Sequence, residues 1–465
     1  MALTLDYPGA LEALEALEGR GMKLGLERIE ALLAVLGNPH KGLRGVLAAG
    51  TNGKGSVCAL LDSMARCAGL RTVMLTKPHL LSWTERIAVD GQPIAEQGFA
   101  DLIATVLDAA TGMVGAHGSP TVFEVVTAAG ILAAHTVQPD LLICEVGLGG
   151  RLDSTNVLDL GVAVITGIAV DHAAELGHDI AGIAAEKAAI IKRGNDVVTG
   201  ADALALDVIR TTAERSGAHS LAAVGTDLPW DGEERGRAGI TVNIGEPVLH
   251  LFSPLIGGFQ RRNLAVAAHT ARVLRRRGTS IPEEAILAGA VAVRWPGRMQ
   301  WIDGSPPLLI DGCHNTEAVA AMVAAAIPLC AGHHTVAVFG AMADKELDDM
   351  LAALRPLTKD VIFTAPATAR AAPGGDLARR WGTGARVAEN VASALDIARS
   401  AAGPEGVVVA GGSLYVAGEA LQAVGSLGRG RGGCAGINRH GEGDANALHR
   451  GASDPRWPRV MRCRP

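Results

Sequence analysis

The chain has 465 residues, of which 48% are hydrophobic, 19% are charged and 3% are aromatic. A chain of this length is longer than a single hydrophobic core usually supports, so we expect two domains. The apolar content excludes a largely disordered chain. The formal net charge of −6 and the few aromatic side chains give no reason to expect nucleic acid or an anionic membrane as partner.

The seven cysteines form no C-x-x-C pair, which indicates reduced thiols. The first turns carry acidic residues and no basic region followed by an apolar core, so we expect no secretion signal. The apolar runs are too short to span a bilayer. We therefore expect a cytoplasmic monomer with no membrane partner.

From residue 45 onward, short apolar runs alternate with amphipathic segments. Residues 45–50 predict a strand, and residues 57–68 place apolar side chains at helical spacing, with a glycine-rich turn between the two. Residues 71–76, 140–146 and 161–168 predict buried parallel strands, each followed by polar residues or glycines. The fold class is therefore α/β, with a P-loop nucleotide-binding domain on a mostly parallel sheet.

Residues 201–255 are less regular and lead into a helix with a basic end. The Pro/Gly stretch VRWPGRMQW, residues 293–301, follows, after which PLLID, HTVAVFG, DVIFTAP and GVVVAGG predict further strands. We predict a first, larger domain with N-terminal helices over residues 1–293. A smaller, Rossmann-like α/β domain is predicted over residues 294–424.

The segment 425–465 has eight arginines against three acidic residues and no apolar periodicity. Such a composition predicts a basic Gly/Arg-rich tail that is disordered. The alternative is an arm that binds RNA, whose binding would be sensitive to salt.

The turn after the first strand is built to hold phosphate. It reads Gly50-Thr51-Asn52-Gly53-Lys54-Gly55-Ser56. A glycine-rich turn before a helix exposes backbone N–H groups to an anion, and the lysine adds a point charge for the outer phosphates. The Walker pattern is not strictly met, because Ala48 replaces its first glycine and Gly55 separates Lys54 from Ser56. An ordinary strand-to-helix turn is the alternative.

A bound nucleotide needs Mg²⁺, which prefers one or two protein oxygen ligands beside phosphate and water. Glu145 ends the strand DLLICE and is followed by VGLGGRLDSTN, which places a carboxylate at a strand end. His172 follows another strand end. By itself such a histidine is more often structural, but the two together favour a metal site.

Eight motifs occur in order along the chain: GTNGKGS, FEVVTAA, EVGLGGRLDSTN, EKAAIIKRG, WPGRMQW, DGCHNTEAV, FGAMADKEL and GGSLYVAGE. Their order and spacing resemble those of the bacterial folylpolyglutamate synthase/dihydrofolate synthase branch of the Mur ligase family. The resemblance covers about residues 5–423. It implies that residues 1–293 are an ATP-binding domain of the Mur ligase type and that residues 294–424 are a glutamate-binding domain. It also implies that ATP phosphorylates a carboxylate. The amine of L-glutamate then displaces phosphate from the acyl phosphate to form an amide.

The resemblance implies roles for individual residues. The residues implied to bind nucleotide are Gly50, Thr51, Asn52, Gly53, Lys54, Gly55, Ser56, Asn263, Arg298, Asp311 and His314. The residues implied to bind magnesium, at one or two sites, are Ser56, Glu145 and His172. The residues implied to be catalytic are Lys54, Lys187, His172 and His314. Lys187 matches a lysine that the family carries as a carbamate, which turns a cation into an anion able to hold metal or orient substrate.

The implied substrates are dihydropteroate or a reduced folate, together with L-glutamate. Phe123, Asp153 and Ser154 match positions near the pterin ring, and Ser413 lies where glutamate is expected. Without the resemblance, we would interpret Phe123 as an ordinary core residue and Lys187 as a solvent-exposed lysine of a helix.

One departure from the family pattern concerns the metal. Lys77 stands where the family has a serine that binds magnesium. Two positive centres close together repel, so we expect either that Lys77 turns towards phosphate or that magnesium binds less tightly. Two alternatives therefore stay open at this stage: another amino-acid ligase of the Mur type, and a non-catalytic or impaired nucleotide-binding paralogue.

Overall fold

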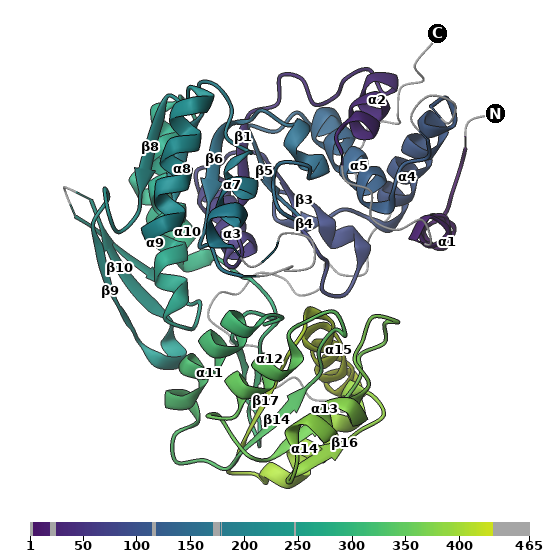
Figure 1. The fold of residues 1–465 in the computed structure, drawn as a ribbon, viewed down its shortest axis with the longest axis vertical. Helices are drawn as coiled ribbons and strands as arrows, with labels where there is room; N and C mark the ends of the chain where they lie inside the picture. Colours follow the sequence, from purple (N-terminus) through teal and green to yellow (C-terminus); the bar gives the residue numbers. More distant parts are fainter. Residues whose placement is uncertain are drawn as a thin grey trace.

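The computed structural model describes residues 3–18, 25–113, 118–170, 177, 179–245 and 248–430. They form two α/β units, with the unit that contains α11 to α15 lying below the other in Figure 1. Each unit has helices on both faces of a mostly parallel sheet, as the clusters of buried side chains show. The predicted α/β fold class is confirmed.

The larger sheet has eight strands in the spatial order β4-β3-β2-β5-β1-β6-β7-β8. All neighbouring pairs are parallel except β2 with β3 and β3 with β4. The strands are β1 (Gly45–Ala49), β2 (Thr72–Leu75), β3 (Ile87–Val89), β4 (Gln92–Pro93), β5 (Leu141–Glu145), β6 (Gly161–Ile165), β7 (Asp196–Thr199) and β8 (Ser220–Ala223). The four strands that we predicted in this sheet are β1, β2, β5 and β6, and β1 lies between β5 and β6.

Successive side chains of a strand point to opposite faces, and β1 shows the result. Val46 and Ala48 pack with α3, α9 and α10, while Leu47 and Ala49 pack with α1, α2, α4, α5, α7 and α8. The helices of this unit are α1 (Tyr7–Glu18), α2 (Glu27–Val35), α3 (Lys54–Cys67), α4 (Glu96–Thr111), α5 (Val122–Val137), α7 (Ile180–Ala188), α8 (Ala203–Ser216), α9 (Phe259–Arg276) and α10 (Glu283–Ala292), with the 3-10 turns η1 (Trp83–Arg86), η2 (Ser154–Val157) and η3 (Gly236–Ala238).

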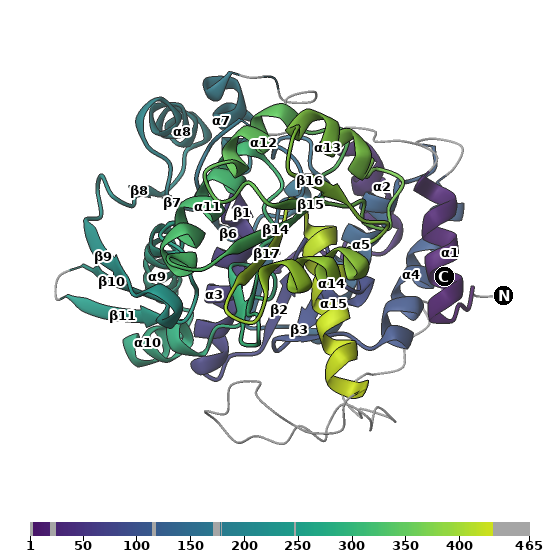
Figure 2. The same ribbon diagram turned by 90° about the horizontal axis from the view of Figure 1, so that it is seen from below.

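The irregular segment 201–255 contains an antiparallel sheet that the sequence analysis did not predict. Its strands are β9 (Trp230–Glu234), β10 (Ile240–Ile244) and β11 (Leu249–Ser253), in the order β11-β10-β9. Ile240, Val242 and Leu251 pack in the same core as α9 and α10. Figure 2 shows this small sheet standing at the side of the molecule next to those two helices.

The second unit has a six-stranded sheet in the order β12-β13-β17-β14-β15-β16. Only β12 with β13 is antiparallel. Its strands are β12 (Gln300–Ile302), β13 (Leu308–Ile310), β14 (Thr335–Phe339), β15 (Val361–Phe363), β16 (Ala385–Val387) and β17 (Val407–Gly411). Its helices are α11 (Thr316–Cys330), α12 (Leu347–Leu354), α13 (Gly374–Trp381), α14 (Val391–Ala402) and α15 (Leu414–Gly430).

The last helix corrects one expectation. Helix α15 continues to Gly430, so it runs six residues into the segment 425–465 that we expected to be disordered. Residues 431–465 lie outside the described residues. The domain boundary at residue 294 stays a prediction. No described helix combines the length and the apolar character needed to cross a bilayer.

A buried histidine in α9 makes the stability of the fold depend on pH. His269 is 5% exposed, and its Nε2 has no hydrogen-bond partner among the described residues. Burial, with Arg272 and Arg276 nearby, lowers its pKa from 6.5 to about 4. The unfolded chain therefore takes up this proton first, so the free energy of unfolding falls as the pH drops from 6.5 towards 4.

We expect this histidine to cost about 2–3 kcal/mol of stability between pH 7.5 and pH 4.5. The His269→Leu variant should lose correspondingly less over the same range, because it has no proton to take up there. Urea unfolding of both proteins at the two pH values measures the difference. The same loss in both proteins would show that His269 does not cause it.

Candidate functional site

The phosphate loop connects β1 to α3 and is held in place by β6. Thr166, just after β6, donates from its Oγ1 to the carbonyl oxygen of Asn52 at 2.7 Å. Thr51 donates from its N–H to the carbonyl of Gly167 at 2.8 Å and from its Oγ1 to that of Ala169 at 2.9 Å. These bonds fix the loop at the carboxyl end of the sheet, where α/β proteins bind their ligands.

The side chain of Lys54 folds back over the phosphate loop. Lys54 begins α3, and its Nζ donates to the carbonyl oxygens of Gly50 and Thr51, at 3.0 Å each. An ammonium held at the N-terminus of a helix adds to the positive potential of the free N–H groups there. The arrangement predicted from the sequence, a glycine-rich turn with a cation at a helix start, is present.

Helix α9 closes the other side of the loop. Gln260 donates from Nε2 to Ser56 Oγ at 3.3 Å and accepts from Asn263 Nδ2 at 2.9 Å. A Cβ added to Gly53 would collide with the Asn263 amide. Two residues predicted from separate motifs, Ser56 and Asn263, therefore meet through Gln260, which the sequence analysis did not select.

Gly53 has a backbone conformation and a position that exclude a side chain. Its φ is +87°, in the left-handed region, and the Asn263 amide occupies the space that a Cβ would need. We expect Gly53→Ala to weaken the binding of a non-hydrolysable ATP analogue at least about tenfold, because the loop must shift. Calorimetric titration measures this affinity.

Gly69 supplies the matched control. Gly69 lies just after the end of α3, the helix that Gly53 precedes. Its φ is +76°, and a Cβ added there would meet nothing within 4 Å. Gly69→Ala should cost roughly 1 kcal/mol of stability through backbone strain and leave nucleotide affinity unchanged. If the two variants bound the analogue equally well, the fit around Gly53 would not matter for binding.

The carboxylate predicted to bind metal lies beside the loop. Glu145 ends β5, is 5% exposed, and accepts from the Lys77 N–H at 3.2 Å. Burial raises the pKa of Glu145, and the nearby charges of Lys54 and Arg298 oppose this rise. A buried carboxylate at a strand end beside the phosphate loop offers oxygen ligands to a metal ion that also binds phosphate. His172, its predicted partner, lies outside the described residues.

The second unit contacts the phosphate loop directly. Asn52 donates from Nδ2 to the Glu317 carboxylate at 2.6 Å and accepts from Asn315 Nδ2 at 3.2 Å. Asn315 caps α11 by accepting from the Ala318 N–H at 2.8 Å. The start of α11 therefore lies against the loop predicted to hold phosphate.

Three further residues predicted to bind nucleotide lie at this junction. Asp311 follows β13, is 5% exposed, and accepts from the N–H groups of Met299 and Cys313 at 2.8 Å each. Burial raises the pKa of Asp311, and Arg298 is the main opposing charge. His314 is oriented by a 3.1 Å contact from Nδ1 to the Gly312 carbonyl.

The residues predicted to hold the pterin ring gather beside α5. Phe123 lies in the first turn of α5, and a Cβ at Gly147 would be 2.7 Å from its ring. Asp153 accepts from the N–H groups of Gly147 at 3.0 Å and Leu148 at 2.9 Å. These bonds fold the glycine-rich segment 147–150 around the Asp153 carboxylate. Ser154 is 4% exposed and begins η2.

The remaining predicted residues sit farther along the chain. Lys187 is 5% exposed in α7, and a Cβ at Gly150 would come 3.0 Å from its Cα, so the glycine-rich segment packs on this helix. Ser413 follows β17, is 1% exposed, and accepts from the Val416 N–H at 3.1 Å. Ser413 therefore lies at the start of α15, at the carboxyl end of the second sheet.

The sequence analysis missed Thr166, Gln260, Asn315 and Glu317. Asn315 could have been recognised, because an asparagine directly before an amphipathic helix is a cap signal. The contact of Asn52 with α11 could not, because it depends on how the two units pack together.

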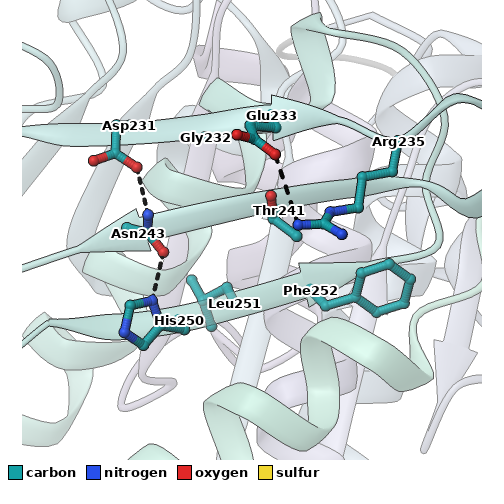
Figure 3. Close-up of a pocket in the computed structure, with 9 residues that line it drawn as sticks. All are labelled: Asp231, Gly232, Glu233, Arg235, Thr241, Asn243, His250, Leu251 and Phe252. Atoms are coloured by element: carbon teal, nitrogen blue, oxygen red, sulfur yellow. Dashed lines mark hydrogen bonds and ion pairs between the residues drawn. The ribbon is translucent and has the colours of Figure 1, made fainter.

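Two pockets lie away from these residues. The first, of about 360 Å³, is on the face of the three-stranded sheet turned away from α9 and α10 (Figure 3). It is lined by Asp231, Gly232, Glu233, Arg235, Thr241, Asn243, His250, Leu251 and Phe252. The second, of about 720 Å³, is lined in part by Gly45, Asp140 and Gly161, at the amino ends of β1, β5 and β6. Neither is at the carboxyl ends of the strands, where the phosphate loop lies.

Comparisons with known proteins give the family. The family model of the Mur ligase, glutamate ligase domain, matches residues 297–414. A dihydrofolate synthase/folylpolyglutamate synthase of Bacillus subtilis (strain 168) is 35% identical over 374 residues, which cover 77% of this chain and 84% of the relative. A probable bifunctional folylpolyglutamate synthase/dihydropteroate synthase of Haloferax volcanii is 35% identical over 431 residues, or 90% of this chain. The chain spans 50% of that longer relative.

Solved structures agree with this fold. The Escherichia coli homologue in complex with DHPP and ADP has a TM-score of 0.82 and 30% identity, covering 91% of this chain and 98% of that one. The Yersinia pestis bifunctional folylpolyglutamate synthase/dihydrofolate synthase, complexed with AMPPNP and Mn ion, has a TM-score of 0.80 and 31% identity, with coverages of 91% and 98%. This chain belongs to the folylpolyglutamate synthase/dihydrofolate synthase family of ATP-dependent ligases.

Proposed function

We propose that this ligase joins L-glutamate to dihydropteroate and to reduced folates through an acyl phosphate. The observation that carries the proposal is the contact of Asn52 with Asn315 and Glu317. It sets the phosphate loop of the first unit against the unit that matches a glutamate ligase domain. A phosphoryl group held in the loop would therefore face both domains, which suits transfer to one substrate followed by attack from another.

The reaction has two steps. The acceptor carboxylate attacks the γ-phosphorus of ATP, ADP leaves, and the acyl phosphate forms. The uncharged amine of glutamate then attacks the acyl carbon, inorganic phosphate leaves with the electron pair of the broken C–O bond, and the nitrogen loses a proton. Phosphorylation is needed because an unmodified carboxylate oxygen is a poor leaving group. The N–H groups from Gly50 to Ser56 and the Lys54 ammonium would bind the phosphates and offset their charge.

The donor set fits magnesium. Glu145 is a buried carboxylate whose pKa is raised by burial, which disfavours its charged form, and a bound cation would offset that cost. Ser56 offers a hydroxyl at the start of α3. One carboxylate and one hydroxyl leave room for the phosphate oxygens and water that Mg²⁺ keeps in its coordination shell. When bound, the ion would neutralise charge that develops on the phosphates.

The remaining assignments follow the family resemblance. His172 would be a further metal ligand, and Lys187, as a carbamate, would hold a second ion or orient the substrate. Asn263, Arg298, Asp311 and His314 would contact the nucleotide. Phe123, Asp153 and Ser154 would hold the pterin end, and Ser413 the glutamate. Asp311 and Ser413 follow β13 and β17 at the carboxyl end of the second sheet, which supports the roles of these two residues.

Incorporation of labelled L-glutamate tests the proposal. Purified protein receives ATP and magnesium with dihydropteroate in one tube and tetrahydrofolate in another. We expect product in both tubes. Product with dihydropteroate alone would restrict the activity to dihydrofolate synthesis, and no product in either tube would overturn the proposal.

A further inference from the structure

A carboxylate of the second unit already binds a donor of the phosphate loop. Asn52 Nδ2 donates to Glu317 Oε2 at 2.6 Å, which is short for a hydrogen bond from an amide N–H. Short bonds of this kind are typical of a charged acceptor. Asn52 belongs to the loop proposed to bind the triphosphate, and Glu317 is the second residue of α11. An anionic oxygen therefore lies where the loop presents a donor to an anion.

Two helix starts meet at this contact. Helix α3 begins at Lys54, two residues after Asn52, and α11 begins at Thr316, directly before Glu317. The two helices lie on opposite sides of the junction between the units (Figure 1). The free N–H groups at the start of a helix give it a positive potential, so two such ends repel each other and attract an anion. The Glu317 carboxylate supplies a negative charge at this junction.

Glu317 has no cation of its own in the part of the chain that the structure describes. Its side chain forms no ion pair there, and its hydrogen-bond partner is Asn52. The ammonium of Lys54 is turned to the loop carbonyls of Gly50 and Thr51. A triphosphate that enters the loop would therefore bring its negative charge close to a carboxylate that no protein cation offsets. Like charges this close repel each other.

The Glu317 side chain can leave the loop while α11 stays in place. Glu317 is exposed, whereas Asn315 is 5% exposed and donates from Nδ2 to the oxygen of the Asn52 amide at 3.2 Å. Asn315 is itself fixed, because its Oδ1 accepts from the Ala318 N–H at 2.8 Å. The loop is fixed as well, since the Asn52 carbonyl accepts from Thr166 Oγ1 at 2.7 Å. Rotation of one exposed side chain therefore frees Asn52 Nδ2.

We propose that Glu317 is a place-holding anion that the triphosphate of ATP displaces from Asn52, and that it thereby sets how tightly the phosphate loop binds nucleotide. Before nucleotide binds, the carboxylate satisfies the loop donor and offsets the two positive helix ends. It then opposes binding until it has moved, so part of the affinity for nucleotide is lost in breaking this contact. The inference rests on the part of the proposed function that assigns nucleotide to this loop, and it is independent of the acceptor.

Calorimetric titration tests the inference. The full chain is titrated with a non-hydrolysable ATP analogue and Mg²⁺, without acceptor or glutamate. Glu317→Gln keeps an oxygen for Asn52 but loses the charge, and a neutral acceptor makes a hydrogen bond roughly half as strong as a charged one. We expect Glu317→Gln to bind the analogue at least about threefold more tightly than the wild type does. Glu317→Ala, which removes the hydrogen bond as well, should gain at least as much.

The salt dependence of this gain shows whether charge causes it. Repulsion between exposed charges is screened by salt, so the ratio of the two affinities should move towards one between about 0.05 M and about 0.5 M KCl. A change in the shape of the loop alone would give a ratio that does not depend on salt. The titrations of the wild type and Glu317→Gln are therefore repeated at both concentrations.

Glu284→Gln is the matched control. Glu284 is exposed and is the second residue of α10, as Glu317 is of α11. The end of α10, and not its start, approaches the phosphate loop, because the ring of Trp295 would lie 2.8 Å from a Cβ added to Gly55. Glu284→Gln removes the same charge from the same helix position, and it should bind the analogue as the wild type does.

The inference is overturned if neither variant of Glu317 gains affinity, if either one loses it, or if the gain is independent of salt. A loss of affinity would mean that Glu317 stabilises the nucleotide-bound state. Glutamate incorporation by the wild type is measured in parallel. Incorporation without a gain in the variants would overturn only this inference. No incorporation with any acceptor, together with tighter binding by the variants, would overturn only the proposed ligation.

Discussion

The Lys54→Ala variant should lose glutamate ligation by roughly a thousandfold or more and remain folded. The ammonium is the cation built into the phosphate loop, where it lies over the carbonyls of Gly50 and Thr51. Phosphoryl transfer depends mainly on positioned positive charge, so removing one such group carries a large penalty. Initial rates of glutamate incorporation at saturating ATP and acceptor measure the loss.

A measurement of the free energy of unfolding distinguishes a loss of catalysis in Lys54→Ala from a loss of the fold. The variant gives up two hydrogen bonds to loop carbonyls, which together cost about 1–3 kcal/mol. Lys359→Ala, an exposed lysine in the second unit, should change neither rate nor stability. If Lys54→Ala kept more than a tenth of the wild-type rate, the lysine would not have the role that the motif predicts.

Replacing Glu145 by glutamine should weaken metal binding and lower turnover at least about a hundredfold. Glutamine keeps an acceptor oxygen for the Lys77 N–H, so the 3.2 Å hydrogen bond can remain while the negative charge is lost. A hard cation such as Mg²⁺ prefers a carboxylate to a neutral amide, so its affinity should fall. Electron paramagnetic resonance of added Mn²⁺, with a non-hydrolysable ATP analogue, counts the bound ions directly.

The matched control for Glu145 is Glu405→Gln, an exposed carboxylate before β17. It should bind Mn²⁺ as the wild type does. Unchanged Mn²⁺ binding by Glu145→Gln would remove this carboxylate from the metal site, whatever the variant does to the rate.

The sequence predicted the core of both sheets, because buried parallel strands leave continuous apolar runs. GVLAAG and DLLICEV became β1 and β5, which are fully buried. The three-stranded sheet was missed for a physical reason. In β9, WDGEE is polar and half-exposed, and in β10 and β11 alternate residues face water, so no continuous apolar run exists.

The parts of the candidate site that lie in one continuous segment of the chain could be predicted from the sequence. The parts that depend on packing between distant segments could not. The glycines and Lys54 of the phosphate loop follow from a strand, a turn and a helix start. The direction of Lys77 does not. Its Nζ donates to Thr127 Oγ1 at 3.1 Å and lies 3.9 Å from the centroid of the Phe123 ring, on a helix about fifty residues later in the chain. Lys77 therefore has not turned towards the phosphate loop, which was one of the two outcomes that we expected. The roles of Lys187 and Ser413 stay predictions that rest on the resemblance.

The hydrogen bond between Asn52 and Glu317 joins residues 265 positions apart in the chain. During synthesis at about 5–20 residues per second, the phosphate loop therefore leaves the ribosome roughly 10–50 s before its partner helix exists. The first unit must fold with its loop exposed, and the site is completed last. Truncated chains that lack α11 would retain a cradle for phosphate without the surface against which ligation is to occur.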